Sequence, residues 1–458
     1  MDKFDLMVIG SGSGLEISAE ASERGMSVAV VEEGPFGGTC LNRGCIPSKM
    51  LIHCADVVET IKKAHLFGIE AHLGKIDWDF IIKRTYEEID QDAQAIEEGN
   101  RSAQNITVFK GSGRFVADKT LEVNGQQITA ETILIAAGTR PWAPSIPGLD
   151  KTPYITSDQA LRLPQQPKRM AIVGGGYIAA ELAHFFGSLG TEVTLIHRRS
   201  TLLREEDEEI ARRFTEVYQR RFNLLLDSQV SQVQTKDGEI YLNVSSQHEV
   251  HEHTVELGVD TLLLATGRVS NTDLLEVANT GVEVDGRGYI KTDQFLETNV
   301  PGIWALGDIV GKYLLKHSAN LEAAYAANNI FHPAHKDAVD YRAMPHAVFA
   351  SPQVASVGLT EDLATRMDID YVTATYNYSD TAYGSSIEDR DGFVKVLAHP
   401  ETREILGCHI IGAEASILIQ EAANAMRLGL PTDAITQSIY VHPALPEVVQ
   451  RAFAQLPV

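Results

Sequence analysis

The same succession of a buried strand, a glycine-rich turn, a helix and a second strand occurs twice in this chain. The first copy comprises Leu6–Ile9, Gly10–Gly14, a helix over 15–24 and Val28–Val31. The second copy comprises Met170–Val173, Gly174–Gly176, a helix through 189 and Val193–Ile196. Short runs of β-branched residues that alternate with helical stretches are typical of parallel sheets covered by helices, so we expect an α/β protein.

A further strand, running into a turn of small residues, follows each copy. Thr132–Ile135 leads to Gly138, and Thr261–Leu264 leads to Gly267. This arrangement indicates one dinucleotide-binding plan that is used twice. After His332 and Pro333, strands near 347–349 and 394–397 alternate with helices such as 417–428, which predicts a separate α+β region.

The charge of the chain bears on its partners. The 458 residues carry a formal net charge of -23, with a sequence pI near 5.0. Such a surface repels phosphate backbones and anionic lipids, so we expect neither nucleic acid nor a membrane as a partner. The sequence contains no apolar run of the ~20 residues that span a bilayer, and MDKFDLMVIG lacks the features of a secretory signal. We therefore expect a cytoplasmic protein.

The first glycine turn meets the requirements of a dinucleotide pyrophosphate. Gly10, Gly12 and Gly14 permit a sharp turn and let a phosphate approach backbone N–H groups at a helix N-terminus. Leu15 stands where the third glycine of G-x-G-x-x-G would fall, so that glycine is either replaced or displaced. Glu32 closes the following strand, where a carboxylate accepts hydrogen bonds from ribose hydroxyls.

The second turn has the G-x-G-x-x-A form, with Gly174, Gly176 and Ala179. The strand that follows runs into a series of basic residues: His197, Arg198, Arg199 and, shortly after, Arg204. Arginine pairs with a 2′-phosphate that a carboxylate would repel, so this site is expected to prefer NADPH over NADH. The alternative is a solvated basic turn, against which the acidic run 205–207 argues.

Cys40 and Cys45 form a close pair in a chain with four cysteines. Their spacing of about one helical turn brings two sulfurs into bonding range only in a helical or tightly looped segment. Zinc would require four ligands, and Cys54 and Cys408 supply no second pair. An iron–sulfur spacing would require a cysteine at Ser48. We therefore expect a redox disulfide beside a flavin, with FAD at the first site, and buried positions for Cys54 and Cys408.

Several motifs together resemble one family. They are GGTCLNRGCIPSK at 37–49, AIVGGGYIAAELA at 171–183, ATGRVSN at 265–271, ALGD at 305–308 and HPALPE at 442–447. On these residues the chain resembles the pyridine nucleotide–disulfide oxidoreductases over essentially its whole length. The resemblance implies two Rossmann-like dinucleotide-binding domains, for FAD and NADPH, and a C-terminal α+β dimerisation domain. The implied ranges are 1–145 and 266–335 for the FAD domain, 146–265 for the NADPH domain and 336–458 for dimerisation.

The resemblance also implies roles for individual residues. Cys45 would face the flavin and Cys40 would exchange with the substrate. Lys49 would lie near the flavin and pair with Glu181, and Tyr177 would cover the flavin until nicotinamide arrives. Other residues are implied to contact a cofactor: Thr39, Gly138 and Asp308 for FAD, and Arg268 towards NADPH.

His442 and Glu447 resemble an acid–base pair that the partner subunit donates in this family. A leaving thiolate must be protonated, and an imidazole oriented by a carboxylate does this near neutral pH. If the site is completed in this way, the protein is a homodimer and its C-terminal domain forms the interface.

The substrate is predicted from shorter stretches that resemble mycothione reductases. These are GRVSNTDLLEVANTGVEVD at 267–285, KYLLKHSANLEAA at 312–324, SVGLTE at 356–361 and HPALPEVV at 442–449. The first helix, LEISAEASERG, has one arginine at its far end, which disfavours glutathione, and FAQLPV contains no further redox cysteine. We expect an NADPH-dependent reductase of a low-molecular-weight disulfide. The alternative, which CIPSK resembles, is an NAD-dependent dihydrolipoamide dehydrogenase.

Overall fold

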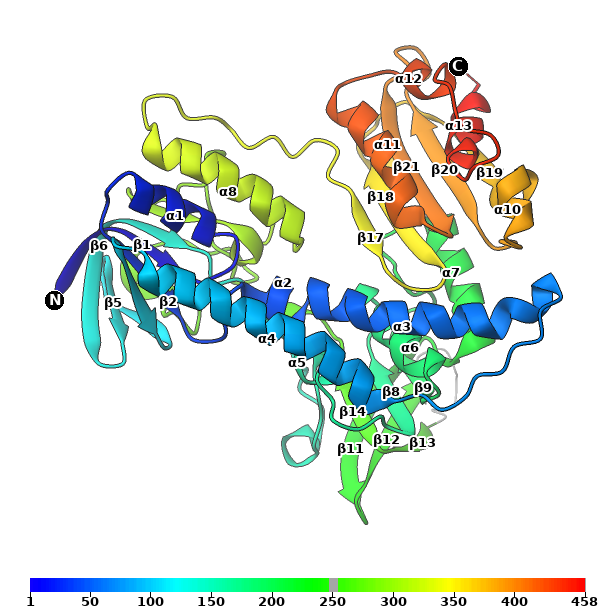
Figure 1. Ribbon diagram of the computed structural model, residues 1–458, viewed down its shortest axis with the longest axis horizontal. Helices are drawn as coiled ribbons and strands as arrows, with labels where there is room; N and C mark the ends of the chain where they lie inside the picture. Colours follow the sequence, from blue (N-terminus) through cyan, green and yellow to red (C-terminus); the bar gives the residue numbers. More distant parts are fainter. Residues whose placement is uncertain (247–253, 458) are drawn as a thin grey trace. The chain divides into compact units, whose positions relative to one another are not determined.

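The computed structural model describes residues 1–246 and 254–457 (Figure 1). The chain divides into two compact units. Unit 1 comprises Met1–Met50, Asp79–Trp142 and Gly267–Tyr341, and unit 2 comprises Leu51–Trp78, Ala143–Thr266 and Arg342–Val458. Within the described residues, every helix is too short or too polar to span a bilayer.

Unit 1 is built on one mixed sheet with the strand order β3-β2-β1-β6-β5-β4, and β16 also pairs with β6. Its strands are β1 (Asp2–Ile9), β2 (Val28–Glu32), β3 (Ile106–Lys110), β4 (Gly113–Ala117), β5 (Thr120–Val123), β6 (Gln126–Ile135) and β16 (Ile303–Ala305). β1 is parallel to β2 and β6, and Leu6–Ile9 is buried, as a run of apolar residues in a covered parallel strand requires. β7 (Thr139–Pro141) pairs antiparallel with β15 (Arg268–Ser270) beside this sheet.

The helices of unit 1 include α1, which follows the glycine turn, and the two helices that carry the cysteines. They are α1 (Leu15–Glu23), α2 (Gly38–Arg43), the start of α3 (Cys45–Lys63), most of α4 (Trp78–Ser102) and α8 (Lys316–Phe331). α1 and α8 lie side by side (Figure 1). Their apolar side chains share a core with β1, which includes Ile17, Ala21 and Ala323.

Unit 2 contains a four-stranded parallel sheet with the order β10-β9-β8-β14. Its strands are β8 (Arg169–Val173), β9 (Glu192–Ile196), β10 (Asn223–Leu225) and β14 (Thr261–Leu264). The accompanying helices are α5 (Ser157–Ala160), α6 (Tyr177–Ser188) and α7 (Glu208–Arg221). An antiparallel sheet follows, made of β11 (Ser228–Lys236), β12 (Glu239–Ser246) and β13 (Thr254–Val259).

The C-terminal part of unit 2 is an antiparallel sheet with the order β17-β18-β21-β20-β19. Its strands are β17 (His346–Val348), β18 (Gln353–Gly358), β19 (Val372–Asn377), β20 (Phe393–Ala398) and β21 (Ile405–Gly412). The helices are α9 (Glu361–Arg366), α10 (Ala382–Ser386), α11 (Ala415–Arg427), α12 (Asp433–Thr436) and α13 (Glu447–Ala454). α11 packs on β18 and β21, and α13 packs on β19 and β20 (Figure 1).

The repeated succession that the sequence predicts is present in both units. β1, α1 and β2 form the first copy, and β8, α6 and β9 form the second. Their ends lie within one residue of the predicted ends, except that β1 begins at Asp2, four residues before the predicted Leu6. β6 and β14, the strands predicted to follow each copy, pair in parallel with β1 and β8. Cys408 is buried on β21 as expected, whereas Cys54 on α3 is only partly buried, which corrects the prediction for that residue.

Candidate active site

The glycine turn of unit 1 lies between β1 and α1. Gly10 has φ +103°, and a Cβ atom there would lie 2.4 Å from the carbonyl oxygen of Ala136, so only glycine fits. A Cβ atom on Gly14 would lie 3.0 Å from the Ala136 methyl group and 3.1 Å from Val8. Gly14 therefore makes the close helix–strand approach that the third glycine usually provides, and Leu15 is the first residue of α1.

Glu32 is buried at the end of β2 and is held by the glycine turn. Its Oε2 accepts a hydrogen bond from Ser11 N at 2.8 Å, and its Oε1 accepts one from Gly34 N at 2.6 Å. Contact with a ribose stays a prediction. The surroundings fit a dinucleotide: among the described residues the buried Ser11 Oγ has no hydrogen-bond partner. A Cβ atom on Gly12 or Gly138 would meet no atom within 4 Å, so a ligand can approach the backbone there.

A second cluster of unit 1 forms where β6 ends. Thr139 Oγ1 donates to Asp308 Oδ2 at 3.0 Å, and Arg268 Nε donates to Thr139 Oγ1 at 2.7 Å. Burial raises the pKa of Asp308, and the charge of Arg268 and the Thr139 hydrogen bond oppose this rise. The structure thus joins Asp308 and Arg268 through Thr139. Their contacts with FAD and with the NADPH side stay predictions.

The cysteine pair lies at the junction of two helices of unit 1. Cys40 is on α2 and Cys45 is the first residue of α3, so the intervening segment is helical or tightly looped as the spacing requires. The Asn42 side chain stabilises this segment, because its Nδ2 donates hydrogen bonds to Phe36 O at 2.8 Å and to Gly38 O at 3.0 Å. Thr39, on the same helix, is half-buried.

The two thiols interact. A hydrogen bond with the Cys45 side chain is the main cause that raises the pKa of Cys40, followed by burial and by the charge of Cys45. Lys316 at the start of α8 acts in the opposite direction. Cys45 is the more exposed of the two. The pair can therefore share one negative charge when both sulfurs are reduced, as coupled groups do.

Lys49 and Glu181 were predicted to pair. Lys49 is half-buried on α3 in unit 1, and Glu181 is 5% exposed on α6 in unit 2. Within unit 2, Glu181 Oε1 accepts a hydrogen bond from Phe349 N at 2.9 Å. The pairing of Lys49 with Glu181 stays a prediction.

The glycine turn of unit 2 repeats the geometry of the first. Gly174 has φ +143°, and a Cβ atom there would lie 2.2 Å from the carbonyl oxygen of Ala265. Gly176 caps α6 and faces open space, and Ala179 is buried one turn later. Tyr177, the first residue of α6, is 43% exposed, as a residue that covers a ligand must be, although its predicted role is untested.

Basic residues gather where β9 ends. Arg198 and Arg204 are exposed, and Arg204 Nε lies 2.8 Å from Glu205 Oε1. Burial lowers the pKa of His197, and the charges of Arg198 and Arg204 lower it further. His197 Nε2 is buried without a hydrogen-bond partner among the described residues. This donor set fits a 2′-phosphate, since two exposed guanidinium groups can pair with an anion and a neutral imidazole can donate to it.

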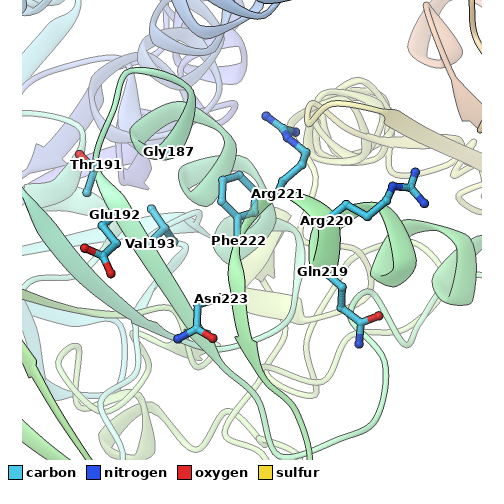
Figure 2. Close-up of a pocket in the computed structure, with 9 residues that line it drawn as sticks. All are labelled: Gly187, Thr191, Glu192, Val193, Gln219, Arg220, Arg221, Phe222 and Asn223. Carbon is cyan, nitrogen blue, oxygen red and sulfur yellow. The ribbon is translucent and has the colours of Figure 1, made fainter.

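A pocket of unit 2 lies apart from this turn. Its lining comes from the end of α6, the start of β9, the end of α7 and the start of β10 (Figure 2): Gly187, Thr191, Glu192, Val193, Gln219, Arg220, Arg221, Phe222 and Asn223. Glu192 begins β9, whereas the glycine turn follows the end of β8, so the two lie at opposite ends of the parallel sheet. Nucleotides bind at the carboxyl ends of such strands, and we assign the pocket no ligand.

His442 and Glu447 are brought together as predicted in the C-terminal part of unit 2. His442 Nδ1 lies 2.9 Å from Glu447 Oε1, and Ala444 N donates to Glu447 Oε2 at 3.1 Å. The hydrogen bond from His442 lowers the pKa of Glu447, so the carboxylate stays charged. Because it accepts from Nδ1–H, Nε2 is left to exchange a proton. The His442 side chain is 68% exposed, and its place beside a second subunit stays a prediction.

Comparisons with known proteins identify the family. Residues 4–329 match the pyridine nucleotide-disulphide oxidoreductase family, and residues 344–453 match its dimerisation domain. The chain belongs to the pyridine nucleotide-disulphide oxidoreductases. It is an enzyme of the flavoprotein disulfide oxidoreductase type, whose family implies FAD and a pyridine nucleotide as cofactors. The predicted family, and an α/β fold with dinucleotide-binding domains and a C-terminal dimerisation domain, are confirmed. The domain boundaries stay predictions.

Individual relatives cover the whole chain. It is 39% identical to mycothione reductase of Mycobacterium tuberculosis, over 100% of both chains. It is 34% identical to dihydrolipoyl dehydrogenase of Chlamydia muridarum, over 98% of this chain and 95% of that protein. The HOCl-induced flavoprotein disulfide reductase RclA from Escherichia coli has a similar structure, with a TM-score of 0.87 and 27% identity, over 98% of this chain and 99% of that one.

Some polar residues of the site were not anticipated from the sequence. Ser11 and Thr139 lie next to the predicted glycines Gly10 and Gly138, which are in the turns that follow β1 and β6, and this position was a usable signal. Glu322, 0% exposed on α8, accepts from Gly307 N at 2.6 Å and thereby holds the turn that carries Asp308. Nothing in the local pattern marked Glu322, because its partner lies 15 residues away in a different element.

Proposed function

We propose that this chain is an FAD-containing, NADPH-dependent reductase of a low-molecular-weight disulfide of the mycothione type. The interacting thiols of Cys40 and Cys45 carry the proposal. FAD, when bound, transfers two electrons from NADPH to the disulfide of these two cysteines. Gly10, Gly12, Gly14, Glu32, Thr39, Gly138 and Asp308 are the residues proposed to hold it.

The protein's own residues carry out the exchange with the substrate. Cys40 passes its proton to His442 Nε2 and attacks one sulfur of the substrate disulfide, a bond forms between Cys40 and that sulfur, and the first thiolate leaves. His442 Nε2 protonates the leaving thiolate while Glu447 stabilises the imidazolium. Cys45 then attacks the Sγ atom of Cys40, which restores the disulfide and releases the second thiol. The sum converts NADPH, a proton and one disulfide into NADP⁺ and two thiols.

The preference for NADPH is supported by the charges that follow β9. Arg198 and Arg204 are exposed, and the position of the ribose-binding carboxylate is occupied by His197. Glu32 stands at the equivalent end of β2 in the first copy, so the two turns differ in the sign of the charge that they present. A guanidinium stabilises a 2′-phosphate that a carboxylate would repel.

The assembly that this mechanism needs is a homodimer, because His442 would act on the cysteines of a second copy. The match of residues 344–453 to a dimerisation domain supports this. We infer that the enzyme acts in the cytoplasm, where low-molecular-weight thiols are kept reduced. Sedimentation at the working concentration tests the dimer, and cell fractionation tests the compartment.

Steady-state kinetics tests the function. Purified enzyme is assayed for oxidation of NADPH and of NADH against a panel of low-molecular-weight disulfides that includes mycothione. We expect kcat/KM to be about tenfold or more higher with NADPH, which corresponds to about 1.4 kcal/mol. Turnover of at least one small disulfide should disappear in Cys45→Ser. A Cys45→Ser enzyme that turns over the same disulfide at the wild-type rate would contradict the proposal.

One alternative has a specific observation in its favour. The chain is 34% identical to dihydrolipoyl dehydrogenase of Chlamydia muridarum over nearly its whole length. An NAD-dependent dihydrolipoamide dehydrogenase would use the same cysteines in the opposite direction, with NAD⁺ as the acceptor. Dihydrolipoamide oxidation is therefore measured beside the panel. A clear preference for NAD⁺ with dihydrolipoamide as the best donor establishes the alternative.

A further inference from the structure

The segment between α12 and α13 carries His442, and its side chains differ in exposure. Ile439 is 101% exposed and Val441 is 78% exposed, whereas Tyr440 between them is half-buried. Ile439, Val441 and the 68% exposed side chain of His442 thus face solvent, whereas Tyr440 packs against the core of its own domain.

Tyr440 is fixed by one contact with a distant helix. Its hydroxyl donates a hydrogen bond to Glu421 Oε1 on α11 at 2.9 Å, 19 residues earlier in the chain. The ring packs against the core that α11 and α13 share with the sheet. A second tether lies further back, where Gln450 Nε2 donates to Ser438 O at 3.2 Å. Tyr440 is thus the side-chain anchor closest to His442 on its N-terminal side within the described residues.

The charges around Glu421 keep this contact intact at working pH. Burial raises the pKa of Glu421 to about 7, and the hydrogen bond from Tyr440 opposes the rise. Burial and the charge of Glu421 raise the pKa of Tyr440, so its hydroxyl stays protonated. Cys408 on β21 is the other titratable group that interacts with Glu421, and burial raises its pKa as well. A protonated hydroxyl can donate to either form of the carboxyl group.

We propose that Tyr440, held by Glu421, is a positioning residue that places His442 for proton transfer in thiol–disulfide exchange. The inference rests on the proposed function. His442 is exposed and bonded within its own chain to Glu447, which follows it, so the peptide that precedes it needs an anchor of its own. A displacement of about 1 Å at a reacting group can cost about 10²-fold in rate, and a freed segment 438–442 would allow such a displacement.

The test separates the two halves of the catalytic cycle in purified dimers. Stopped-flow absorbance follows flavin reduction by NADPH, and then reoxidation of the reduced enzyme by the best disulfide of the panel. We expect Tyr440→Phe and Glu421→Leu to slow reoxidation by about tenfold or more and to leave flavin reduction unchanged. Glu421→Gln should restore reoxidation to near the wild-type rate, because the amide oxygen still accepts from Tyr440.

Two controls complete the design. Tyr371→Phe removes a hydroxyl of the same domain whose contact is with the exposed Thr365 at 3.4 Å, and it should change neither half-reaction. His442→Ala gives the reoxidation rate that remains when the imidazole is removed completely. Sedimentation verifies that each variant remains dimeric.

The remaining outcomes contradict either the positioning role of Tyr440 or the proposed function. Wild-type reoxidation in Tyr440→Phe, together with a large loss in His442→Ala, overturns the positioning role and leaves the proposed function standing. Equal losses in both half-reactions also overturn it, because the defect is then a general structural one. A loss in Glu421→Gln as large as in Tyr440→Phe overturns the role of the hydrogen bond. Full reoxidation in His442→Ala overturns the proposed function and the inference with it.

Discussion

Two glycines of the second turn, Gly174 and Gly176, have different roles that can be measured separately. Gly174 adopts φ +143° with Ala265 O against it, whereas Gly176 has φ -88° and faces open space. We expect Gly174→Ala to lower the thermal midpoint by several degrees, because the new Cβ atom meets backbone. Gly176→Ala should fold normally and weaken NADPH binding, because the methyl group occupies the path of the pyrophosphate. Calorimetry measures the thermal midpoint, and coenzyme titration measures NADPH binding. Equal stability of both variants would contradict this assignment.

Two exposed arginines, Arg198 and Arg204, follow β9. Replacing Arg198 and Arg204 together by Gln should weaken NADPH binding by about tenfold to a hundredfold and change NADH binding little, because the proposed partner of both guanidinium groups is the 2′-phosphate, which NADH lacks. The flavin content, read from absorbance, should stay constant. Arg199→Gln serves as a neighbouring control. Unchanged NADPH affinity in the double variant would remove the phosphate-site interpretation.

At the scale of elements, Lys395 joins three of them in unit 2. It is 2% exposed on β20, and its Nζ lies 3.0 Å from Asp207 Oδ1 at the N-cap of α7 and bonds with Glu361 of α9. Lys395→Met leaves Asp207 buried and unbalanced, which should cost about 3–5 kcal/mol of unfolding free energy. Asp207→Asn in the same chain should restore part of it, because Asn also caps a helix. Urea unfolding of the single and double variants measures the difference; a single variant as stable as wild type contradicts the prediction.

The contact between the loop before α7 and β17 gives a pH dependence. His346 Nε2 lies 2.8 Å from Glu206 Oε1, and Ser356 Oγ donates to Glu206 Oε2 at 2.6 Å. Burial lowers the pKa of His346, but the hydrogen bond and charge of Glu206 outweigh it, so the net shift is upward. The folded state then binds more protons than the unfolded state above pH 6.5. The stabilisation is complete below that pH and is lost as pH rises through the higher folded pKa.

We therefore expect the thermal midpoint to fall as pH rises above 6.5 through the raised pKa of His346, and His346→Gln to reduce that slope. Burial lowers the pKa of His409 nearby, so His409 contributes an opposite slope, confined to pH below 6.5. Replacement of the exposed His53 by Gln is the matched control. Identical pH profiles for wild type and His346→Gln would contradict the assigned direction.

At the scale of the whole molecule, a site completed by a second copy can be tested with hybrid dimers. Cys40→Ser and His442→Ala should each abolish disulfide reduction. A heterodimer of the two variants, purified through two different tags, keeps one site with intact cysteines and an intact partner histidine. It should recover about half of the wild-type activity. Recovery of no activity, with flavin and dimer content unchanged, would place His442 in the same chain as the cysteines that it serves.

The local parts of this protein could be predicted from the sequence. The strand, turn and helix of each dinucleotide unit follow from apolar runs and from glycines at positions such as Gly10 and Gly174, where a side chain would meet backbone. His442 and Glu447 could be paired because they are five residues apart. Each of these requirements is met by neighbours in the chain, so a short stretch contains the information.

Other features depended on the tertiary structure. Thr139 contacts Asp308 across 169 residues, Lys395 contacts Asp207 across 188, and Tyr440 reaches back to Glu421. Gly14 was settled as the close-packing glycine only by the distance to Ala136. By itself, the sequence determined the family, the cysteine pair and the charge difference between the two turns, because these are properties of residue type and spacing. The tertiary structure decided which buried polar groups meet, because such partners are chosen by packing between elements far apart in the chain.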